Sequence, residues 1–375
     1  MGGTRPKVLH VIPGLGLGGA EAMLTNIATA PGRRTEPIVV DLLRGGANAD
    51  RLRAANIPLH ELGVRGPTSF LFALRRLARL IDDLQPDVVQ GWMYYGDLAA
   101  ALALGRSGRR DTTRLYWGVR CSDMDLSNYG LALRSAVRAC RRFSHMPDAV
   151  IANSEAGARV HRALGYRSSA FLVIENGVDT DRFRPDATLR AATRDALGVD
   201  AAAQVAILPA RVDPMKDHAG FLAALDSLPG VTGLAVGLGT ERLPRRANLI
   251  GLGPRDDMPA LYNAADLMVL SSAYGEGFST VLGEAMACGL PAVVTDVGDS
   301  ARIVADTGSV VPPRDPAALA AAIAAFFSKP AAERAALGQA ARARMVEEFS
   351  LERALERFET LYLKGPLDSS IETAA

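Results

Sequence analysis

The alternation of short apolar runs with longer stretches of helical period constrains the fold of this chain more than any other feature. The runs are six or seven residues long and rich in valine, isoleucine and leucine. Most lack strict polar alternation, as is typical of strands covered on both faces. Strands that alternate with helices form βαβ units, so the pattern predicts parallel sheets. The clearest runs are residues 7–12, 37–43, 87–92, 148–154, 170–176, 204–210, 233–239, 266–272 and 291–296.

Chain length and the position of one connector predict two such sheets. The chain has 375 residues, which exceeds one ordinary core and suits two. Residues 177–186 contain glycine, proline and charges without apolar periodicity, as expected of a connector. We therefore predict an α/β fold of two doubly wound, Rossmann-like domains. The expected parts are domains over 1–180 and 181–348, a helix over 349–364 that packs back toward the N-terminal domain, and a flexible tail over 365–375.

Charge and cysteine content exclude several classes of protein. The formal net charge is +1, whereas nucleic-acid-binding domains are usually strongly basic. The three cysteines lie far apart and form no CxxC pair, which favours a reducing cytoplasm. The longest apolar run is shorter than the roughly 20 residues that span a bilayer. We therefore expect a cytoplasmic protein with no nucleic-acid partner, whose contact with the inner face of the membrane, if any, is peripheral.

A glycine-rich loop follows the first expected strand. Gly14, Gly16 and Gly19 match the GxGxxG pattern, and Asp41 ends the second strand, where a dinucleotide fold places its ribose-binding acid. The loop thus supports one alternative function, an NAD(P)- or FAD-dependent oxidoreductase. Pro13 fits poorly with a tight dinucleotide turn, and a glycine turn without a ligand is a further alternative. Any anion bound here would face free backbone N–H groups at the helix start.

Two glutamates flank the start of a later helix. Glu276 lies in a glycine-rich loop, and Glu284 lies about one and a half turns into the helix that begins near Ser279. The N–H groups of Gly277, Phe278 and Ser279 point out of that helix start, where they and the helix dipole favour a diphosphate. One carboxylate can accept from ribose hydroxyls and the other from sugar hydroxyls. The arrangement therefore suits a nucleotide sugar, the alternatives being a helix-start charge and a solvated helical position.

Two cations follow the strand 204–210. Arg211 and Lys216 come at the carboxyl end of a parallel strand, where ligands bind in open α/β sheets. A guanidinium and an ammonium together can hold a diphosphate and offset the charge of a departing nucleotide. A surface turn with two charges is the alternative. It is weakened because Lys216 is one of only four lysines in the chain, and arginine does not replace a compact ammonium at a phosphate.

Taken together, these residues resemble glycosyltransferase family 4, the retaining glycosyltransferases of GT-B fold. The resemblance rests on the E-x7-E element from Glu276 to Glu284 and on Arg211 with Lys216. It covers almost the whole chain and is densest from 204 to 325. The further segments that carry it are residues 14–21, 176–183, 251–272 and 307–323.

The resemblance implies a role for each matching residue. Arg211 and Lys216 would bind the donor diphosphate and stabilise the leaving group. Glu276, the third expected catalytic residue, would hold hydroxyls of the donor sugar, and Glu284 would bind the ribose. The other expected donor-binding residues belong to the N-terminal loop, the border of the base and the helix start: Gly16, Gly18, Gly19, Gly253, Arg255, Gly277, Phe278 and Ser279.

The resemblance also implies the reaction and its partners. The site would lie in the cleft between the two domains, with hinge closure on donor binding. The donor would be a nucleoside-diphosphate sugar, most simply UDP-linked, from which a hexosyl or N-acetylhexosaminyl group passes with retention and without metal. The acceptor would be a sugar, lipid-linked or small molecule in cell-surface glycan, glycolipid, polysaccharide or natural-product biosynthesis. A module that binds the nucleotide sugar without transferring it is a third class.

Two positions depart from the family pattern. Many relatives carry a histidine near the donor sugar, whereas this chain has Tyr95 and Arg120 at the corresponding strand ends. We expect Tyr95, Trp117 and Arg120 on the acceptor and sugar side, with aromatic packing at a strand end as the alternative. The DxD triplets at 123–125 and 179–181 lack accompanying ligands, so no metal is expected.

Charge is distributed unevenly along the chain. Residues 1–179 carry 23 Lys/Arg and 16 Asp/Glu, so the expected acceptor-side half is basic, and residues 70–84 are both basic and amphipathic. Such surfaces are either solvated or dock an anionic acceptor or an anionic membrane. One helix is expected to align Arg134, Arg138, Arg141, Arg142 and His145 in a single stripe.

Overall fold

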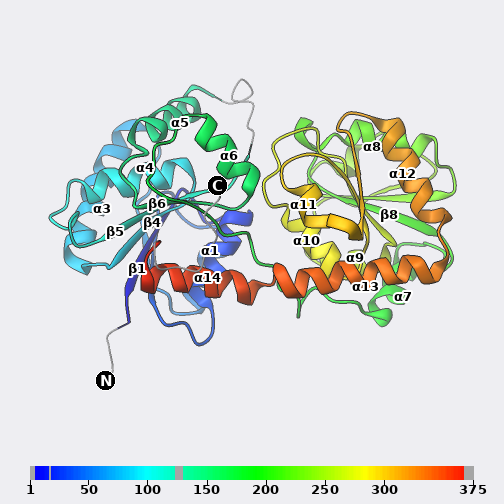
Figure 1. The fold of residues 1–375 in the computed structure, drawn as a ribbon, viewed down its shortest axis with the longest axis horizontal. Helices are drawn as coiled ribbons and strands as arrows, with labels where there is room; N and C mark the ends of the chain where they lie inside the picture. Colours follow the sequence, from blue (N-terminus) through cyan, green and yellow to red (C-terminus); the bar gives the residue numbers. More distant parts are fainter. Residues whose placement is uncertain (1–4, 17, 123–129, 367–375) are drawn as a thin grey trace. The chain divides into compact units, whose positions relative to one another are not determined.

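The computed structural model describes residues 5–16, 18–122 and 130–366. The chain forms two compact units, of which unit 1 comprises the chain to Asn176 and again from Ala354, and unit 2 comprises Gly177–Arg353. Each unit contains one parallel sheet with helices packed against it (Figure 1). The predicted α/β class with two doubly wound, Rossmann-like sheets is therefore confirmed. The chain passes from unit 1 to unit 2 after Asn176, where the expected boundary was at 180.

Unit 1 is built on a seven-stranded parallel sheet in the order β3-β2-β1-β4-β5-β6-β7. The direction of winding reverses between β1 and β4, which makes their carboxyl ends the place where ligands bind in such sheets. The strands are β1 (Lys7–Ile12), β2 (Glu36–Asp41), β3 (Leu59–Glu61), β4 (Val88–Gly91), β5 (Arg114–Val119), β6 (Ala149–Ala152) and β7 (Phe171–Val173). The helices are α1 (Gly19–Thr29), α2 (Ala47–Ala54), α3 (Pro67–Leu84), α4 (Met93–Leu104), α5 (Leu131–Phe143), α6 (Glu155–Ala163) and α14 (Leu351–Lys364).

The C-terminal helix α14 completes the core of unit 1 from Ala354 onward. Its Phe358 is fully buried and stacks on Trp92, with ring centroids 6.0 Å apart. The hydroxyl of Tyr362, also fully buried, donates a hydrogen bond to Gln90 Oε1. Burial of two aromatic side chains is worth several kcal/mol, so this late segment is an integral part of the N-terminal core. Residues 367–375 of the expected tail lie outside the described residues.

Unit 2 repeats the plan with a six-stranded parallel sheet in the order β10-β9-β8-β11-β12-β13. Its winding reverses between β8 and β11, so the carboxyl ends of these two strands meet at one edge. The strands are β8 (Gln204–Pro209), β9 (Val231–Val236), β10 (Leu249–Gly251), β11 (Leu267–Leu270), β12 (Ala292–Thr295) and β13 (Ser309–Val311). The helices are α7 (Ala187–Ala196), α8 (His218–Asp226), α9 (Met258–Ala264), α10 (Thr280–Ala287), α11 (Ser300–Val304), α12 (Pro316–Ser328) and α13 (Ala331–Glu348).

Local sequence explains where several helices begin. Ser154 precedes α6, and its hydroxyl accepts a hydrogen bond from the Gly157 N–H at 3.0 Å. Asp186 and Asp315 cap α7 and α12 by the same geometry, each with an acceptor distance of 2.9 Å. Such caps satisfy N–H groups that have no partner within the helix and are each worth about 1 kcal/mol.

The structure differs from the sequence prediction at the sheet edges and at one helix end. The edge strands β3, β10 and β13 have three residues each, which is too short to show a periodic pattern. Helix α5 ends at Phe143, so His145 lies beyond the helix and does not extend the predicted basic stripe. Among the residues that the structure describes, no helix combines the length and the hydropathy that a membrane span needs.

Candidate active site

Lys216 and Glu276 form an ion pair at the carboxyl edge of the unit 2 sheet. Lys216 ends a short 3-10 turn, Pro214–Lys216, after β8, and Glu276 follows the neighbouring strand β11. The Lys216 Nζ donates to Glu276 Oε1 at 2.5 Å, and the Ser272 hydroxyl donates to the same oxygen at 2.5 Å. The two charged side chains are only 14% and 7% exposed. A carboxylate and an ammonium that are largely withdrawn from water therefore meet where the topology favours a ligand.

Backbone contacts hold the two loops in register. The Ser271 hydroxyl donates to the Lys216 carbonyl at 2.8 Å, and the Ala273 N–H donates to the Met215 carbonyl at 2.7 Å. Asp213 Oδ1 accepts from the Met215 N–H at 2.9 Å and so shapes the turn that carries Lys216. These bonds join the loop after β8 to the loop after β11. The ion pair is therefore positioned by the backbone as well as by its own charges.

Gly298 is a structural requirement of this site that sequence reasoning missed. Its φ is +64°, and a Cβ placed there would lie 2.1 Å from the carbonyl oxygen of Glu276. No side chain larger than hydrogen fits at that distance, and the left-handed backbone itself favours glycine. The available signal was its place just after the strand β12, at the same edge as Glu276. Ser272, the second donor to Glu276, was missed because a serine at a strand end is common.

Glu284 lies in α10 and is paired with a buried tyrosine. Its Oε2 accepts a hydrogen bond from the Tyr262 hydroxyl at 3.0 Å. Burial raises the pKa of Glu284 to about 7, against smaller lowering effects of that hydrogen bond and of Arg182. The carboxylate is therefore costly to ionise without a further donor, such as a hydroxyl of a bound ligand.

The pKa of Glu284 predicts how stability depends on pH. The folded-state pKa of about 7 lies above the ordinary 4.5, so the folded state holds the proton more tightly and stability falls as pH rises through this window. We expect the wild type to lose on the order of 3 kcal/mol relative to Glu284→Gln between about pH 4.5 and about pH 7. Thermal unfolding of both proteins across this range measures the difference, and parallel profiles would contradict it.

The other predicted residues of unit 2 lie along the same edge of the sheet. Arg211 follows β8, is 59% exposed at its side chain and pairs with Asp213 at 3.0 Å. Gly253 and Arg255 follow β10, and Arg255 pairs with Asp257 at 2.5 Å. The partners of these arginines, Asp213 and Asp257, are 29% and 40% exposed at their side chains, so these ion pairs cost less to exchange for a phosphate than the buried pair of Lys216 does.

The start of α10 offers backbone groups to a ligand. The helix begins at Thr280, with Ser279 as its N-terminal flanking residue. Phe278 is buried, and its ring packs against Phe349 at 5.4 Å between centroids. Its side chain thus belongs to the core, so Gly277, Phe278 and Ser279 can contribute contacts mainly through N–H groups.

The N-terminal glycine loop of unit 1 leads into α1. That helix begins at Gly19, preceded by Gly18 in an extended conformation. Gly16 has open space where a Cβ would be, and its carbonyl accepts from Asn48 Nδ2 at 2.6 Å. Asp41 is fully buried, and its Oδ1 accepts from the Leu43 N–H at 2.8 Å. An acid so enclosed cannot bind a ribose, which removes the second element of the dinucleotide alternative.

The residues expected on the acceptor side of unit 1 differ in where the structure places them. Trp117 is fully buried and packs edge-on against Tyr166, as the aromatic-packing alternative expects, and its place on the acceptor side stays a prediction. The strand β5, which carries Trp117, is covered on both faces. The local sequence does not show whether a residue lies within such a strand or at its accessible end. Tyr95 and Arg120 both line a cavity at the carboxyl edge of the sheet. The Arg120 guanidinium lies over the Trp92 ring at 4.5 Å, and burial lowers its pKa to about 10.

The structure describes one of the two DxD triplets. Residues 123–125 lie outside the described residues. In the second triplet, Asp179 Oδ1 accepts from the Arg182 N–H at 2.9 Å, which makes it part of a turn. In the described part of the chain, no group of three or more His, Cys, Asp or Glu is arranged to hold a metal ion.

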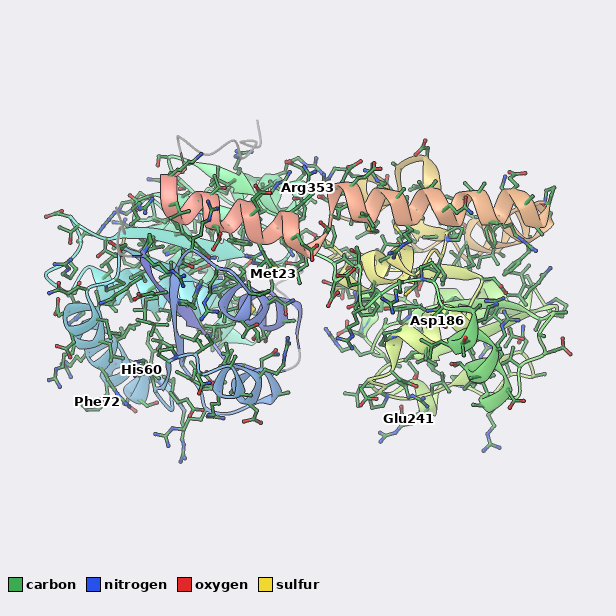
Figure 2. All side chains as sticks on the ribbon, turned by 90° about the horizontal axis from the view of Figure 1, so that it is seen from below. Met23, His60, Phe72, Asp186, Glu241 and Arg353 are labelled. Carbon is green, nitrogen blue, oxygen red and sulfur yellow. The ribbon has the colours of Figure 1, made fainter. Side chains whose placement is uncertain are left out.

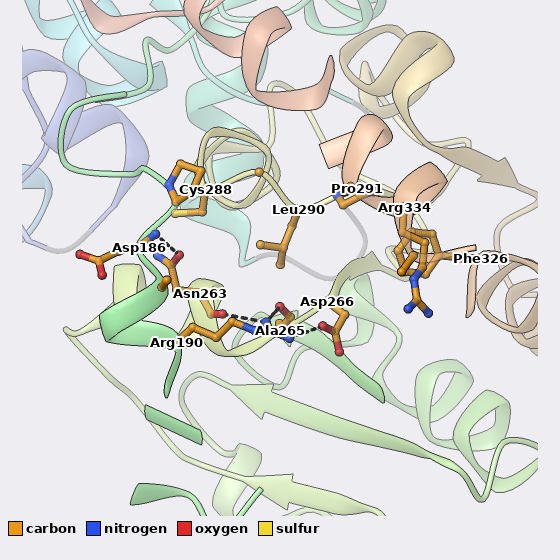
Figure 3. A pocket seen from close by; sticks show the side chains of 15 residues that line it. Asp186, Arg190, Asn263, Ala265, Asp266, Cys288, Leu290, Pro291, Phe326 and Arg334 are labelled. Atoms are coloured by element: carbon orange, nitrogen blue, oxygen red, sulfur yellow. Dashed lines mark hydrogen bonds and ion pairs between the residues drawn. The ribbon is translucent and has the colours of Figure 1, made fainter. Parts of the chain in front are cut away.

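A larger cavity of unit 2, of about 410 Å³, lies at the opposite edge of the sheet (Figure 3). Asp266 and Pro291, which line it, directly precede β11 and β12. Asp266 pairs with Arg190 at 2.5 Å and with Arg194 at 2.9 Å. None of the predicted site residues is among the described residues that line this cavity, and its charges serve to join α7 to β11.

Comparison with known families assigns both units. The family described as Glycosyltransferase Family 4 matches residues 17–182, and Glycosyl transferases group 1 matches residues 190–344. Curated relatives include D-inositol 3-phosphate glycosyltransferases of Mycolicibacterium paratuberculosis, 33% identical over 52% of this chain and 48% of the relative, and of Catenulispora acidiphila, 32% identical over 49% and 48%. The chain thus spans about half the length of the curated relatives it matches.

Solved structures agree with the fold. Anabaena HepE in complex with UDP has a TM-score of 0.79 at 24% identity and covers 94% of this chain and 98% of its own. Sucrose-phosphate synthase of Thermosynechococcus elongatus has a TM-score of 0.75 at 18% identity, over 96% and 99%. The two family matches indicate a glycosyltransferase and therefore contradict the oxidoreductase alternative. The chain belongs to the family 4 type of glycosyltransferases and has their two-domain, Rossmann-like GT-B fold.

Proposed function

We propose that this protein transfers a sugar with retention from a nucleoside-diphosphate sugar, UDP-linked in the simplest case, to a hydroxyl group of an acceptor. The observation that carries the proposal is the buried pair of Lys216 and Glu276 beside the start of α10. An ammonium and the backbone N–H groups at a helix start together suit a diphosphate. A carboxylate next to them suits sugar hydroxyls, so one edge offers groups for both halves of the donor.

The proposed step follows from these groups. The bond between the anomeric carbon and the phosphate oxygen breaks while the acceptor oxygen bonds to the same face of that carbon, and the acceptor proton passes to the departing phosphate. Lys216 and Arg211 stabilise the negative charge that grows on the leaving group. Glu276 orients the sugar through its hydroxyls. No side chain has to act as a nucleophile or hold a metal.

The remaining donor contacts complete the proposal. Gly277, Phe278 and Ser279 offer backbone N–H groups, and Glu284 accepts from the ribose. The segment at Gly253 and Arg255 borders the base. The loop before α1, with Gly16, Gly18 and Gly19, is a further place where backbone N–H groups can meet a phosphate. Solved neighbours in complex with UDP and with UDP-glucose support a uridine donor.

A thermal-shift screen of UDP-, GDP- and ADP-sugars tests the donor class, followed by proton NMR of the product to read its anomeric configuration. We expect UDP and one UDP-sugar to raise the melting temperature and the product to keep the configuration of the donor. A response to NAD(P) instead of nucleotide sugars, or an inverted product, would overturn the proposal. If the protein binds a nucleotide sugar but shows no turnover with any acceptor tested, the result would favour a module that binds the nucleotide sugar without transferring it.

We further propose that α3 docks on an anionic membrane surface. Leu71 and Phe72 are adjacent on this helix and 60% and 68% exposed, and Phe72 is labelled in Figure 2. Arg75, Arg76 and Arg79 are exposed on the following turns, with the Arg75 guanidinium 5.9 Å from the Phe72 ring. Two exposed apolar side chains beside three cations suit the interface of an anionic bilayer.

Replacing Leu71 and Phe72 with serine is expected to weaken binding to phosphatidylglycerol-containing vesicles by at least about tenfold, because burial of each side chain contributes more than 1 kcal/mol. Co-sedimentation measures the partition. Val346→Ser in unit 2, where Val346 is 43% exposed, is the matched control and should bind as the wild type does. Equal binding to neutral phosphatidylcholine vesicles, or no binding at low salt, would refute the membrane contact.

A further inference from the structure

A second cavity lies at the carboxyl edge of the unit 1 sheet, beside the switch point between β1 and β4. Its volume is about 270 Å³. The residues that define its position are Pro13 after β1, Met93 and Tyr95 at the start of α4, Val119 at the end of β5, and Leu133 on α5. Three segments that follow neighbouring strands thus line it together with one helix, in the place where open α/β sheets bind ligands.

The walls of this cavity are apolar, and their polar groups are occupied elsewhere. The Tyr94 hydroxyl, from a lining residue, is hydrogen-bonded to His161 Nε2 at 3.0 Å and to Cys121 Sγ at 3.3 Å. Burial raises the pKa of the Cys121 thiol to about 11, so this cysteine stays neutral at physiological pH. What faces the cavity is therefore mainly hydrocarbon, aromatic surface and thioether.

Arg120, the charged residue among the described lining residues, does not offer its charge to the cavity. Its guanidinium lies over Trp92 at 4.5 Å and over Phe358 at 5.4 Å. One of its terminal nitrogens donates to Asn176 Oδ1 at 3.3 Å, while Nε and the other terminal nitrogen are buried without a hydrogen-bond partner. An atom that faced a cavity of this size would be accessible to water. The cation is thus held within the aromatic core.

Met93 adds a local sign that the site is specialised. It is the first residue of α4 and has a φ of +59°, a left-handed conformation that costs a non-glycine residue about 1–3 kcal/mol and persists at ligand sites. Methionine is also the side chain that adapts most readily to irregular apolar partners.

We propose that this cavity receives a neutral apolar group, alkyl or aryl, of the acceptor. The inference rests on the proposed glycosyl transfer and names the class of acceptor for it. A cavity of about 150 Å³ lined by aliphatic side chains takes up benzene, so the larger volume here admits a phenyl ring or a short alkyl chain. A phosphate in the same place would need paired cations and hydrogen-bond donors, whereas the described lining residues include one cation, Arg120, whose guanidinium lies over aromatic rings.

Methyl NMR of the protein labelled at methionine tests the proposal without requiring turnover. The probes are octyl β-D-glucopyranoside below its micellar concentration, glucose and glucose 6-phosphate, and Met93→Leu assigns the signal. We expect octyl glucoside to shift the Met93 signal at a concentration at least about tenfold lower than glucose or glucose 6-phosphate requires. The proposal is overturned if glucose 6-phosphate is as effective, if octyl glucoside has no effect, or if it moves all methionine signals alike.

A matched pair of variants on α5 locates the binding. Leu133→Asp places a charge in the cavity wall and should weaken the octyl glucoside response at least about tenfold. Leu131→Asp lies on the same helix, where Leu131 is 76% exposed, and should respond as the wild type does. Equal responses of the two variants would refute the site. The thermal shift caused by UDP, measured on the same samples, separates the two proposals. A sample that no longer responds to UDP counts against the proposed glycosyl transfer. If the response to UDP is retained while octyl glucoside has no effect, only the proposal for the cavity is refuted.

Discussion

Lys216→Ala is expected to lower kcat by about two to three orders of magnitude, the cost of removing one preorganised group that stabilises charge in a transition state. Lys216 is the ammonium held at 2.5 Å from Glu276 at the carboxyl edge of β8 and β11. In the proposed step it meets the negative charge that grows on the departing diphosphate. UDP release in a coupled assay measures the effect, with circular dichroism to verify folding.

Two further variants serve as comparisons for Lys216→Ala: the conservative replacement Lys216→Arg and the surface control Lys329→Ala. Arginine keeps the charge but spreads it over a planar fork that does not fit the space of an ammonium, so we expect Lys216→Arg to recover only part of the activity. Lys329 is paired with Glu333 on the surface, at side-chain exposures of 39% and 48%, and its removal should leave kcat unchanged. Turnover by Lys216→Ala close to that of the wild type would refute the assignment of the site.

Glu276→Ala should both abolish transfer and destabilise unit 2 by about 3 kcal/mol. The reason is that the variant leaves the ammonium of Lys216 buried without its counter-charge. Lys216 Nζ and the Ser272 hydroxyl both donate to Glu276 Oε1, so two donors lose their acceptor at once. The melting temperature of the variant measures the loss of stability, and the UDP-release assay measures the loss of transfer.

A double variant separates stability from catalysis at this pair. Lys216→Met combined with Glu276→Leu removes both charges and should be more stable than Glu276→Ala alone, because no uncompensated charge remains. It should nevertheless be inactive. Glu333→Ala, from the exposed pair with Lys329, is the matched control and should cost between about 0 and 1 kcal/mol. A Glu276→Ala protein as stable as this control would show that the ion pair contributes nothing to folding.

The family resemblance was readable from particular residues because it depends on local order. Arg211 and Lys216 follow the strand β8, whereas Glu276 precedes α10 and Glu284 lies within it, after the adjacent strand β11, so each pair lies within a short stretch of sequence. The confirmed fold and family follow from such stretches. The packing of Trp117 was not readable in this way, since its neighbours in sequence do not reveal that Tyr166 packs against it.

By itself, the sequence determined two parallel α/β sheets and put Arg211, Lys216 and Glu276 just after strands, because strand and helix periods are properties of short segments. Only the tertiary structure decided that Lys216 and Ser272 both donate to one carboxylate oxygen of Glu276, and that Glu284 accepts a hydrogen bond from Tyr262. It also decided that Arg120 lies against aromatic rings while an apolar cavity opens beside it. Such contacts join positions far apart in the chain, and they depend on strand order and side-chain packing, which no local pattern encodes.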